Sequence, residues 1–357
     1  GGCSQVAVAR LSWHDKASLV LVACAWGCPT SRPESLDVSI PSVASTATAI
    51  ESPGTPPVFS IGPMRLIDTS KAPATSVACN EARVVWTDAS GAVMTSRFGD
   101  GSPRQLSKGP AVMALALSGD DLFALLDSDP RFTVAQARGS VWVPIEEQVV
   151  TPTANIAADA ESVVWVARTG SDDALFVLDR RSGRVESRSL GDVHERIARV
   201  VVDRRHAFVL ADDSTHEPHL HDADLDGSGV RQVRAAGKLQ DVGVADGVVV
   251  GLERAADPVI TDLLVLGDRT RRVARFPAAS HPTVVVGGGA ACFLSDSDAT
   301  DAATIGCVDL ATGVTREADK LASHGKFLGI CGGKRLVWTR PNQARDGWEV
   351  VYAEMRR

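Results

Sequence analysis

Residues 156–165 read IAADAESVVW, an apolar strand followed by a tight polar turn and a second apolar strand. Six further segments of the chain align beneath this one, so the stretch is one copy of an internal repeat. Their second strands begin 38, 41, 44, 42, 42 and 45 residues apart, so the period averages 42. In chain order the seven segments are VACNEARVVW, ALALSGDDLF, IAADAESVVW, VVVDRRHAFV, VGVADGVVVG, VVVGGGAACF and GICGGKRLVW.

A second hairpin follows in the repeats, as in LFVLDRRSGRVESRSL and IGCVDLATGVTREA, which gives four strands per unit. Residues 58–357 consist of short β-branched runs between Gly, Asp and Ser turns, without a helical period. Four strands in a repeat of this length suit a β-propeller blade. We expect an all-β fold, a seven-bladed β-propeller of four-stranded antiparallel blades, with six or eight blades as the alternative count.

The two ends of the repeat region complement each other. The seventh repeat ends after three strands, whereas PMRLIDTS, residues 63–70, resembles a fourth strand that lacks a preceding partner. We therefore expect this N-terminal strand to complete the last blade. Closing the ring in this way removes free sheet edges that would otherwise invite aggregation.

Hairpins such as DLDGSGVRQV, residues 224–233, resemble those of TolB-like, lipoprotein-receptor-type and quinoprotein-like propeller blades. The resemblance covers residues 58–357 and implies a propeller fold, in the setting of a bacterial lipoprotein. It implies no single activity, because such blades serve scaffolds, lectins and several classes of enzyme.

The N-terminal region has the pattern of an export signal over residues 1–28. Lys16 precedes a short apolar stretch that ends in small residues and cysteines. Within it LVAC, residues 21–24, resembles the bacterial lipobox, which implies lipidation of Cys24. Cys28 is the alternative, although the bulky Trp26 stands where a lipobox has smaller residues. An ordinary cleaved signal or a buried apolar segment remains the other interpretation.

Residues 29–57 are rich in Ser, Thr, Pro and Ala and contain no aromatic residue, which is typical of a flexible tether. No apolar run of 18 residues occurs beyond the N-terminal region. We expect an exported monomer at the cell envelope, in the periplasm or at the outer-membrane surface, attached through its lipid anchor only.

The overall charge disfavours one class of partner. The formal net charge is −7, and 44% of the residues are hydrophobic. Nucleic-acid binders need a basic footprint, which this composition does not supply.

The connections between the second and third strands of the repeats all contain aspartate, and they should share one face of the ring. Many arginines fall in the turns of the opposite face. An acidic face attracts cations or a basic partner, but aspartate is also simply a good turn residue. The candidate binding residues on this face are Asp88, Asp127, Asp129, Asp172, Asp173, Asp212, Asp213, Asp257, Asp296 and Asp298.

Four cysteines lie within the repeats, an even number that suits an oxidising compartment. Cys292 and Cys307 occupy neighbouring strands of one hairpin and could form a disulfide. Cys79 and Cys331 occupy the same register position in the first and seventh blades. Because symmetry-equivalent side chains should point the same way round the ring, we expect no bond between them. Burial as small apolar residues is the alternative for both pairs.

The stretch HDADLDGSG, residues 221–229, begins like a calcium loop, but Val233 stands where the bidentate carboxylate should be. We interpret it as a hairpin turn. A zinc site could be drawn from His216, His219 and His221, but a polar blade edge is the simpler interpretation. The sequence contains no G-x-S-x-G, P-loop or H-E-x-x-H motif. We assign no catalytic residue, metal or cofactor.

These features favour a binding module for a protein, peptide or glycan at the cell envelope. One alternative is a propeller enzyme, a hydrolase, lactonase or quinoprotein-like dehydrogenase, with its site at the channel mouth. The other is a structural component of the envelope.

Overall fold

The computed structural model describes residues 59–357, apart from 89, 101, 129–130, 150–154, 171, 192–193, 195, 214, 227–228, 236–237, 268, 279–281, 298–301, 322–327 and 345. The expected signal, the tether and both candidate lipidation sites, Cys24 and Cys28, lie outside the described residues. Every secondary-structure element of the described part is a β-strand. No helix that could cross a membrane is found there.

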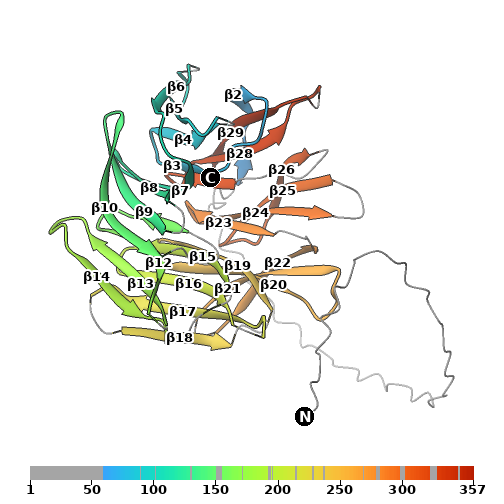
Figure 1. Ribbon diagram of the computed structural model, residues 1–357. Coiled ribbons are helices and arrows are strands. Elements are labelled where there is room, and N and C mark those ends of the chain that lie inside the picture. Colours follow the sequence, from blue (N-terminus) through green and yellow to red (C-terminus); the bar gives the residue numbers. More distant parts are fainter. Residues whose placement is uncertain are drawn as a thin grey trace, which may run out of the picture. The chain divides into compact units, whose positions relative to one another are not determined.

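The strands form seven antiparallel four-stranded blades arranged in a ring, which confirms the predicted fold class (Figure 1). Blades 2 and 3 are also joined by one backbone pair between β10 and β12. In chain order the strands of blades 1 to 6 are β3 (Val77–Cys79), β4 (Arg83–Thr87), β5 (Val93–Arg97), β6 (Arg104–Ser107); β7 (Val112–Ser118), β8 (Asp121–Ser128), β9 (Arg131–Arg138), β10 (Val141–Val149); β11 (Ile156–Ala158), β12 (Ser162–Thr169), β13 (Asp172–Asp179), β14 (Val185–Ser189); β15 (Arg196–Asp203), β16 (His206–Asp212), β17 (Pro218–Asp224), β18 (Gly229–Ala235); β19 (Leu239–Ala245), β20 (Val248–Arg254), β21 (Ile260–Leu266), β22 (Arg271–Pro277); and β23 (Thr283–Gly287), β24 (Ala290–Ser297), β25 (Ala302–Asp309), β26 (Thr315–Leu321).

Blade 7 combines both ends of the described chain. It contains β27 (Leu328–Cys331), β28 (Arg335–Pro341) and β29 (Trp348–Arg356), and β2 (Arg65–Ser70) pairs with β29 as its fourth strand. The short β1 (Ser60–Ile61) pairs with the last residues of β29. In Figure 1 the blue β2 accordingly lies beside the red β29. The predicted closure of the ring by an N-terminal strand is confirmed.

The first strand of each blade is its innermost strand and contacts the first strands of both neighbouring blades. Because the strands alternate in direction, the connections between second and third strands all emerge on one face, which we call the loop face. The tight turns between first and second and between third and fourth strands emerge on the opposite face, which we call the turn face. The first strands begin at the loop face.

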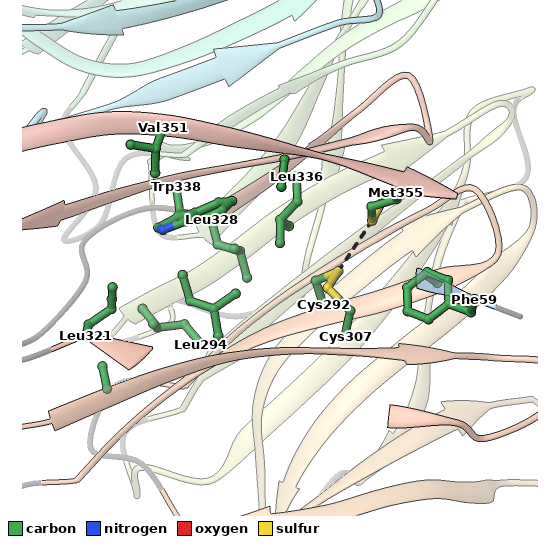
Figure 2. Packing of buried hydrophobic residues seen from close by; sticks show 14 residues of the cluster. Phe59, Cys292, Leu294, Cys307, Leu321, Leu328, Leu336, Trp338, Val351 and Met355 are labelled. Carbon is green, nitrogen blue, oxygen red and sulfur yellow. Dashed lines mark hydrogen bonds between the residues drawn. A yellow bond between two sulfur atoms is a disulfide. The ribbon is translucent and has the colours of Figure 1, made fainter. Parts of the chain in front are cut away.

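The hydrophobic core lies between neighbouring blades. The VVW and LVW ends of three repeats place Trp86, Trp165 and Trp338 on second strands, and each is almost fully buried. Burying a side chain of this kind contributes up to about 3 kcal/mol. Figure 2 shows one such cluster between blades 6 and 7, to which Leu294 of β24 and Leu336 of β28 both contribute. The apolar side chains of the repeats therefore hold adjacent blades together by packing between them.

Two disulfides lie within the described residues. Cys292 and Cys307 are directly paired across β24 and β25 and form one of them, buried in the cluster of Figure 2. Cys79 and Cys331 form the other, so the expectation that they do not bond was wrong. Their Cα atoms are 5.3 Å apart, which lies within the usual range for a disulfide. The error lay in assuming exact rotational symmetry, because twisted first strands approach closely where the ring is narrowest.

Candidate functional site on the loop face

The aspartates of several loop-face connections are engaged within their own turns. Asp88 accepts hydrogen bonds from the backbone N–H groups of Ser90 and Ala92. Asp213 accepts from Thr215 and Glu217 in the same way, and Asp257 accepts from Val259. These contacts are what a turn-forming aspartate makes.

The remaining candidates are dispersed. Asp212 pairs with Arg196, and Asp173 is fully buried. Asp127 is exposed one residue before the end of β8, and Asp172 is the first residue of β13. Asp129 and Asp298 lie outside the described residues, as does the side chain of Asp296. Binding of a partner by this set of aspartates stays a prediction.

A cavity of about 500 Å³ opens on the loop face where the first strands of blades 4, 5 and 6 begin. We call it the loop-face pocket. It also extends over the ends of β16 and β20 and the start of β17, and its size is typical of a small-molecule site. Its lining residues are Arg196, Ala198, Arg199, Asp212, His216, Pro218, Lys238, Leu239, Gln240, Asp241, Arg254, Pro282 and Thr283.

Irregular strand pairing shapes this pocket. Strand β15 has a register shift between Ile197 and Arg199, and β19 has one between Leu239 and Asp241. The extra residue in β19 is Gln240, which lines the pocket. A bulge bends its strand and re-aims side chains, and bulges are common beside functional sites.

The charge of the loop-face pocket is the reverse of what an acidic loop face would give. Its lining includes four cationic side chains, those of Arg196, Arg199, Lys238 and Arg254, but only two carboxylates. Burial raises the pKa of Asp241, and nearby Arg199 offsets this only in part. A raised pKa disfavours the charged form of this carboxyl.

Two of the lining residues each have a buried polar atom that lacks a hydrogen-bond partner among the described residues. These atoms are Nε of Arg199 and Oε1 of Gln240. Arg199 Nε lies 3.8 Å from Asp241 Oδ1, an ion pair that is too long for a hydrogen bond. Asp241 itself accepts from the backbone N–H of Val284 in blade 6, at 2.7 Å. Buried polar groups are normally paired, so each exception calls for an explanation.

The boundary between blades 3 and 4 contains a polar cluster that the sequence reasoning missed. Nε2 of His194 lies 3.1 Å from Nε2 of His221, and both side chains are buried. The backbone N–H of His194 donates to Asp173 at 2.7 Å, and Arg168 donates to the other oxygen of Asp173. His194 stands alone in the linker before β15, so only the fold could bring it to His221.

The three histidines considered for a zinc site are separated by the fold. His221 points into the blade boundary, whereas His219 binds Asp213 at the edge of blade 4. Among the described residues no group of three or more His, Cys, Asp or Glu is arranged to hold a metal ion. The stretch HDADLDGSG spans the end of β17 and the start of β18, and its Asp222 pairs with Arg231.

A larger cavity of about 820 Å³ lies on the turn face between blades 3 and 4, and many arginines line it. Most of these arginines already have partners within the protein. Arg180 pairs with Asp121, Arg205 with Asp226, and Arg188 donates to backbone carbonyl groups of blade 4. Because most of its charges are paired within the protein, this groove is the weaker candidate for a ligand site.

No protein-family model matches this sequence, and no curated protein is similar to it. Solved structures do resemble the fold. The chain overlays an oligogalacturonate lyase in complex with manganese with a TM-score of 0.58 and 13% identity, covering 85% of this chain and 97% of the lyase. A chain of the mitotic checkpoint complex gives a TM-score of 0.57 and 11% identity, covering 88% and 99%. TolB from Acinetobacter baumannii gives 0.48 and 9%, covering 68% and 65%. At these identities the likeness to the lyase and to the checkpoint-complex chain shows the fold alone.

Proposed function

We propose that this chain is an exported, lipid-anchored binding module that engages a ligand or partner at the cell envelope through its loop face. The observation that carries the proposal is the loop-face pocket, which has the size of a ligand site and two unpaired buried polar atoms. Its polar lining residues are available to bind a ligand. In the turn-face groove of the same molecule, by contrast, most of the arginines are already paired with other residues of the protein.

The cysteines support export. Both disulfides join residues of the folded ring, and disulfides form and persist in oxidising compartments. The LVAC pattern before the tether supplies the means of anchoring, because a lipidated Cys24 would hold the propeller at a membrane surface.

Lipidation is tested with the full chain expressed in a bacterium that processes lipoproteins. We expect incorporation of labelled palmitate and recovery in the membrane fraction, both lost in Cys24→Ser. Cys28→Ser is the matched control and should keep both. Labelling that survives Cys24→Ser but not Cys28→Ser would move the anchor, and labelling of neither would contradict anchoring.

Binding through the loop face is tested by placing a photo-crosslinking amino acid at Val259 in the full chain in cells. Val259 is 65% exposed in the connection between β20 and β21, on the loop face. Val141 is 63% exposed at the start of β10, on the turn face, and is the matched control. We expect discrete envelope adducts from position 259 only. Adducts from position 141 alone, or none from either, would contradict the proposal.

A further inference from the structure

We propose that the loop-face pocket binds a hydroxylated organic acid, a compact polar molecule that carries both a carboxylate and hydroxyl groups. This inference rests on the proposed binding function and names the chemical class of its ligand. Three features of the pocket carry it: its cations, its unpaired atoms and its shape.

The first feature is a concentration of positive charge that the protein does not neutralise. The backbone N–H of Arg254 donates to the carbonyl of Lys238, so these two exposed cations stand side by side at the ends of β19 and β20. Neither forms an ion pair with another residue of the described part of the chain. Like charges held together favour the binding of an anion.

The neighbouring arginines extend this charge inward. Arg196 pairs with Asp212 at 2.9 Å, which leaves its remaining donors for other acceptors. Arg199 keeps an unpaired Nε beside Asp241. A carboxylate is an acceptor that suits such donors, and charge-assisted hydrogen bonds are the strong ones.

The unpaired oxygen of Gln240 adds a requirement that a bare anion does not meet. Gln240 Oε1 is a buried acceptor, so its partner must donate a hydrogen bond. A fully ionised inorganic anion such as sulfate has no donor. A hydroxyl group on the same molecule as the carboxylate supplies one.

The shape and polarity of the pocket limit the size of the ligand. Its apolar lining comes only from Ala198, Leu239, Pro218 and Pro282, among the described lining residues. A cavity of about 500 Å³ that is also lined by several charged side chains suits one or two sugar-sized rings rather than an acyl chain. A uronic acid has the required carboxylate and hydroxyl groups on one ring.

Calorimetric titration of the full chain at constant ionic strength tests the assignment with three probes: D-glucuronate, D-glucose and sulfate. Glucose keeps the ring hydroxyls and lacks the carboxylate, whereas sulfate keeps negative charge and lacks hydroxyls. We expect glucuronate to bind at least about ten-fold more tightly than either. No binding of glucuronate, or equal binding of glucose or sulfate, would overturn the inference.

Variants then locate the site. Lys238→Gln and Arg254→Gln should each weaken glucuronate binding about ten-fold, and Gln240→Met should weaken it while changing sulfate binding little. Arg184→Gln on the turn face, where Arg184 is 76% exposed, is the control and should bind as the parent chain does. Circular dichroism and the melting temperature check that each variant is folded. Parent-like binding by all three pocket variants would overturn the inference.

A short oligomer of glucuronate residues separates two sources of the ligand. Tighter binding of the oligomer than of the monomer identifies an acidic residue of an envelope polysaccharide, and equal binding identifies a free acid. Crosslinking from position 259 separates failure of this inference from failure of the proposed function. Discrete adducts without glucuronate binding would overturn only the ligand class, whereas loss of both would overturn the binding function too.

Discussion

Two buried aspartates occupy comparable places at different blade boundaries, and their surroundings differ. Asp173 of blade 3 accepts the backbone N–H of His194 at 2.7 Å, and Asp241 of blade 5 accepts that of Val284 at 2.7 Å. Each therefore ties its blade to the chain of the next one. Arg168 donates a hydrogen bond to Asp173 at 3.2 Å, whereas Nε of Arg199 lies 3.8 Å from Oδ1 of Asp241, which is too far for a hydrogen bond.

The pKa values of the two carboxyls move in opposite directions as a result. Burial alone would raise the pKa of Asp173, but hydrogen bonds from His194 and Arg168 outweigh it and hold the pKa below its ordinary value. Burial raises the pKa of Asp241 because its partners compensate less. Asp173 is thus the better satisfied of the two carboxyls, although Nδ1 of the neighbouring His194 has no hydrogen-bond partner among the described residues. Asp241, beside the loop-face pocket, is the less satisfied carboxyl, and incompletely compensated groups of this kind are common at functional sites.

The largest expected effect is the loss of the satisfied contact. Asp173→Asn keeps the size of the side chain but removes the charge that Arg168 and His194 stabilise. We expect the free energy of unfolding at pH 7 to fall by about 2 kcal/mol, the usual value of hydrogen bonds to a buried charge. Urea unfolding followed by tryptophan fluorescence measures it.

A surface ion pair provides the control for this substitution. Asp226 pairs with Arg205 at 2.8 Å, and both side chains are more than half exposed. Asp226→Asn should therefore cost at most about 1 kcal/mol. An equal loss in both variants would mean that burial does not distinguish the contact at Asp173.

The architecture could be predicted from the sequence because each blade corresponds to one repeat, and the strands of a repeat are close together in the chain. The spacing of residues such as Val84 and Val163 predicts the blades, and the unpaired strand at 63–70 predicts the ring closure. The disulfide of Cys79 and Cys331 was missed, because it depends on how two strands 252 residues apart in the chain approach each other.

The candidate site was less accessible to sequence reasoning. Aspartates recur in the loop-face connections because they form turns, and this frequency suggested an acidic binding face. Cations of the pocket come from strand ends of different blades, such as Arg196 and Arg254, with no common spacing. A register shift at Gln240 leaves no signal in hydrophobic alternation, so the pocket emerges only when the ring is assembled.

A smaller effect of the opposite kind is expected at Asp241. Because burial already disfavours its charged form, Asp241→Asn should lose less stability at pH 7 than Asp173→Asn, or gain some. The same substitution removes negative charge from the pocket lining, so glucuronate binding should strengthen. A loss of stability equal to that of Asp173→Asn would show that the pair with Arg199 is as well satisfied as the contact at Asp173.

The smallest and most specific effect is the pH dependence of these differences. Asp173 has a lowered pKa in the folded state, so its contribution to stability is complete above the ordinary carboxyl pKa of 3.8 and is lost as the pH falls through the folded value. Asp241 has a raised pKa, so the parent chain gains stability relative to Asp241→Asn as the pH falls from neutral toward 3.8.

Urea unfolding of the parent and both variants from pH 7 to pH 3 isolates each carboxyl, because every other group titrates equally in all three. The advantage of the parent over Asp173→Asn should shrink only below about pH 4. Curves that stay parallel over the whole range would mean that the two boundaries do not differ in the way their contacts indicate.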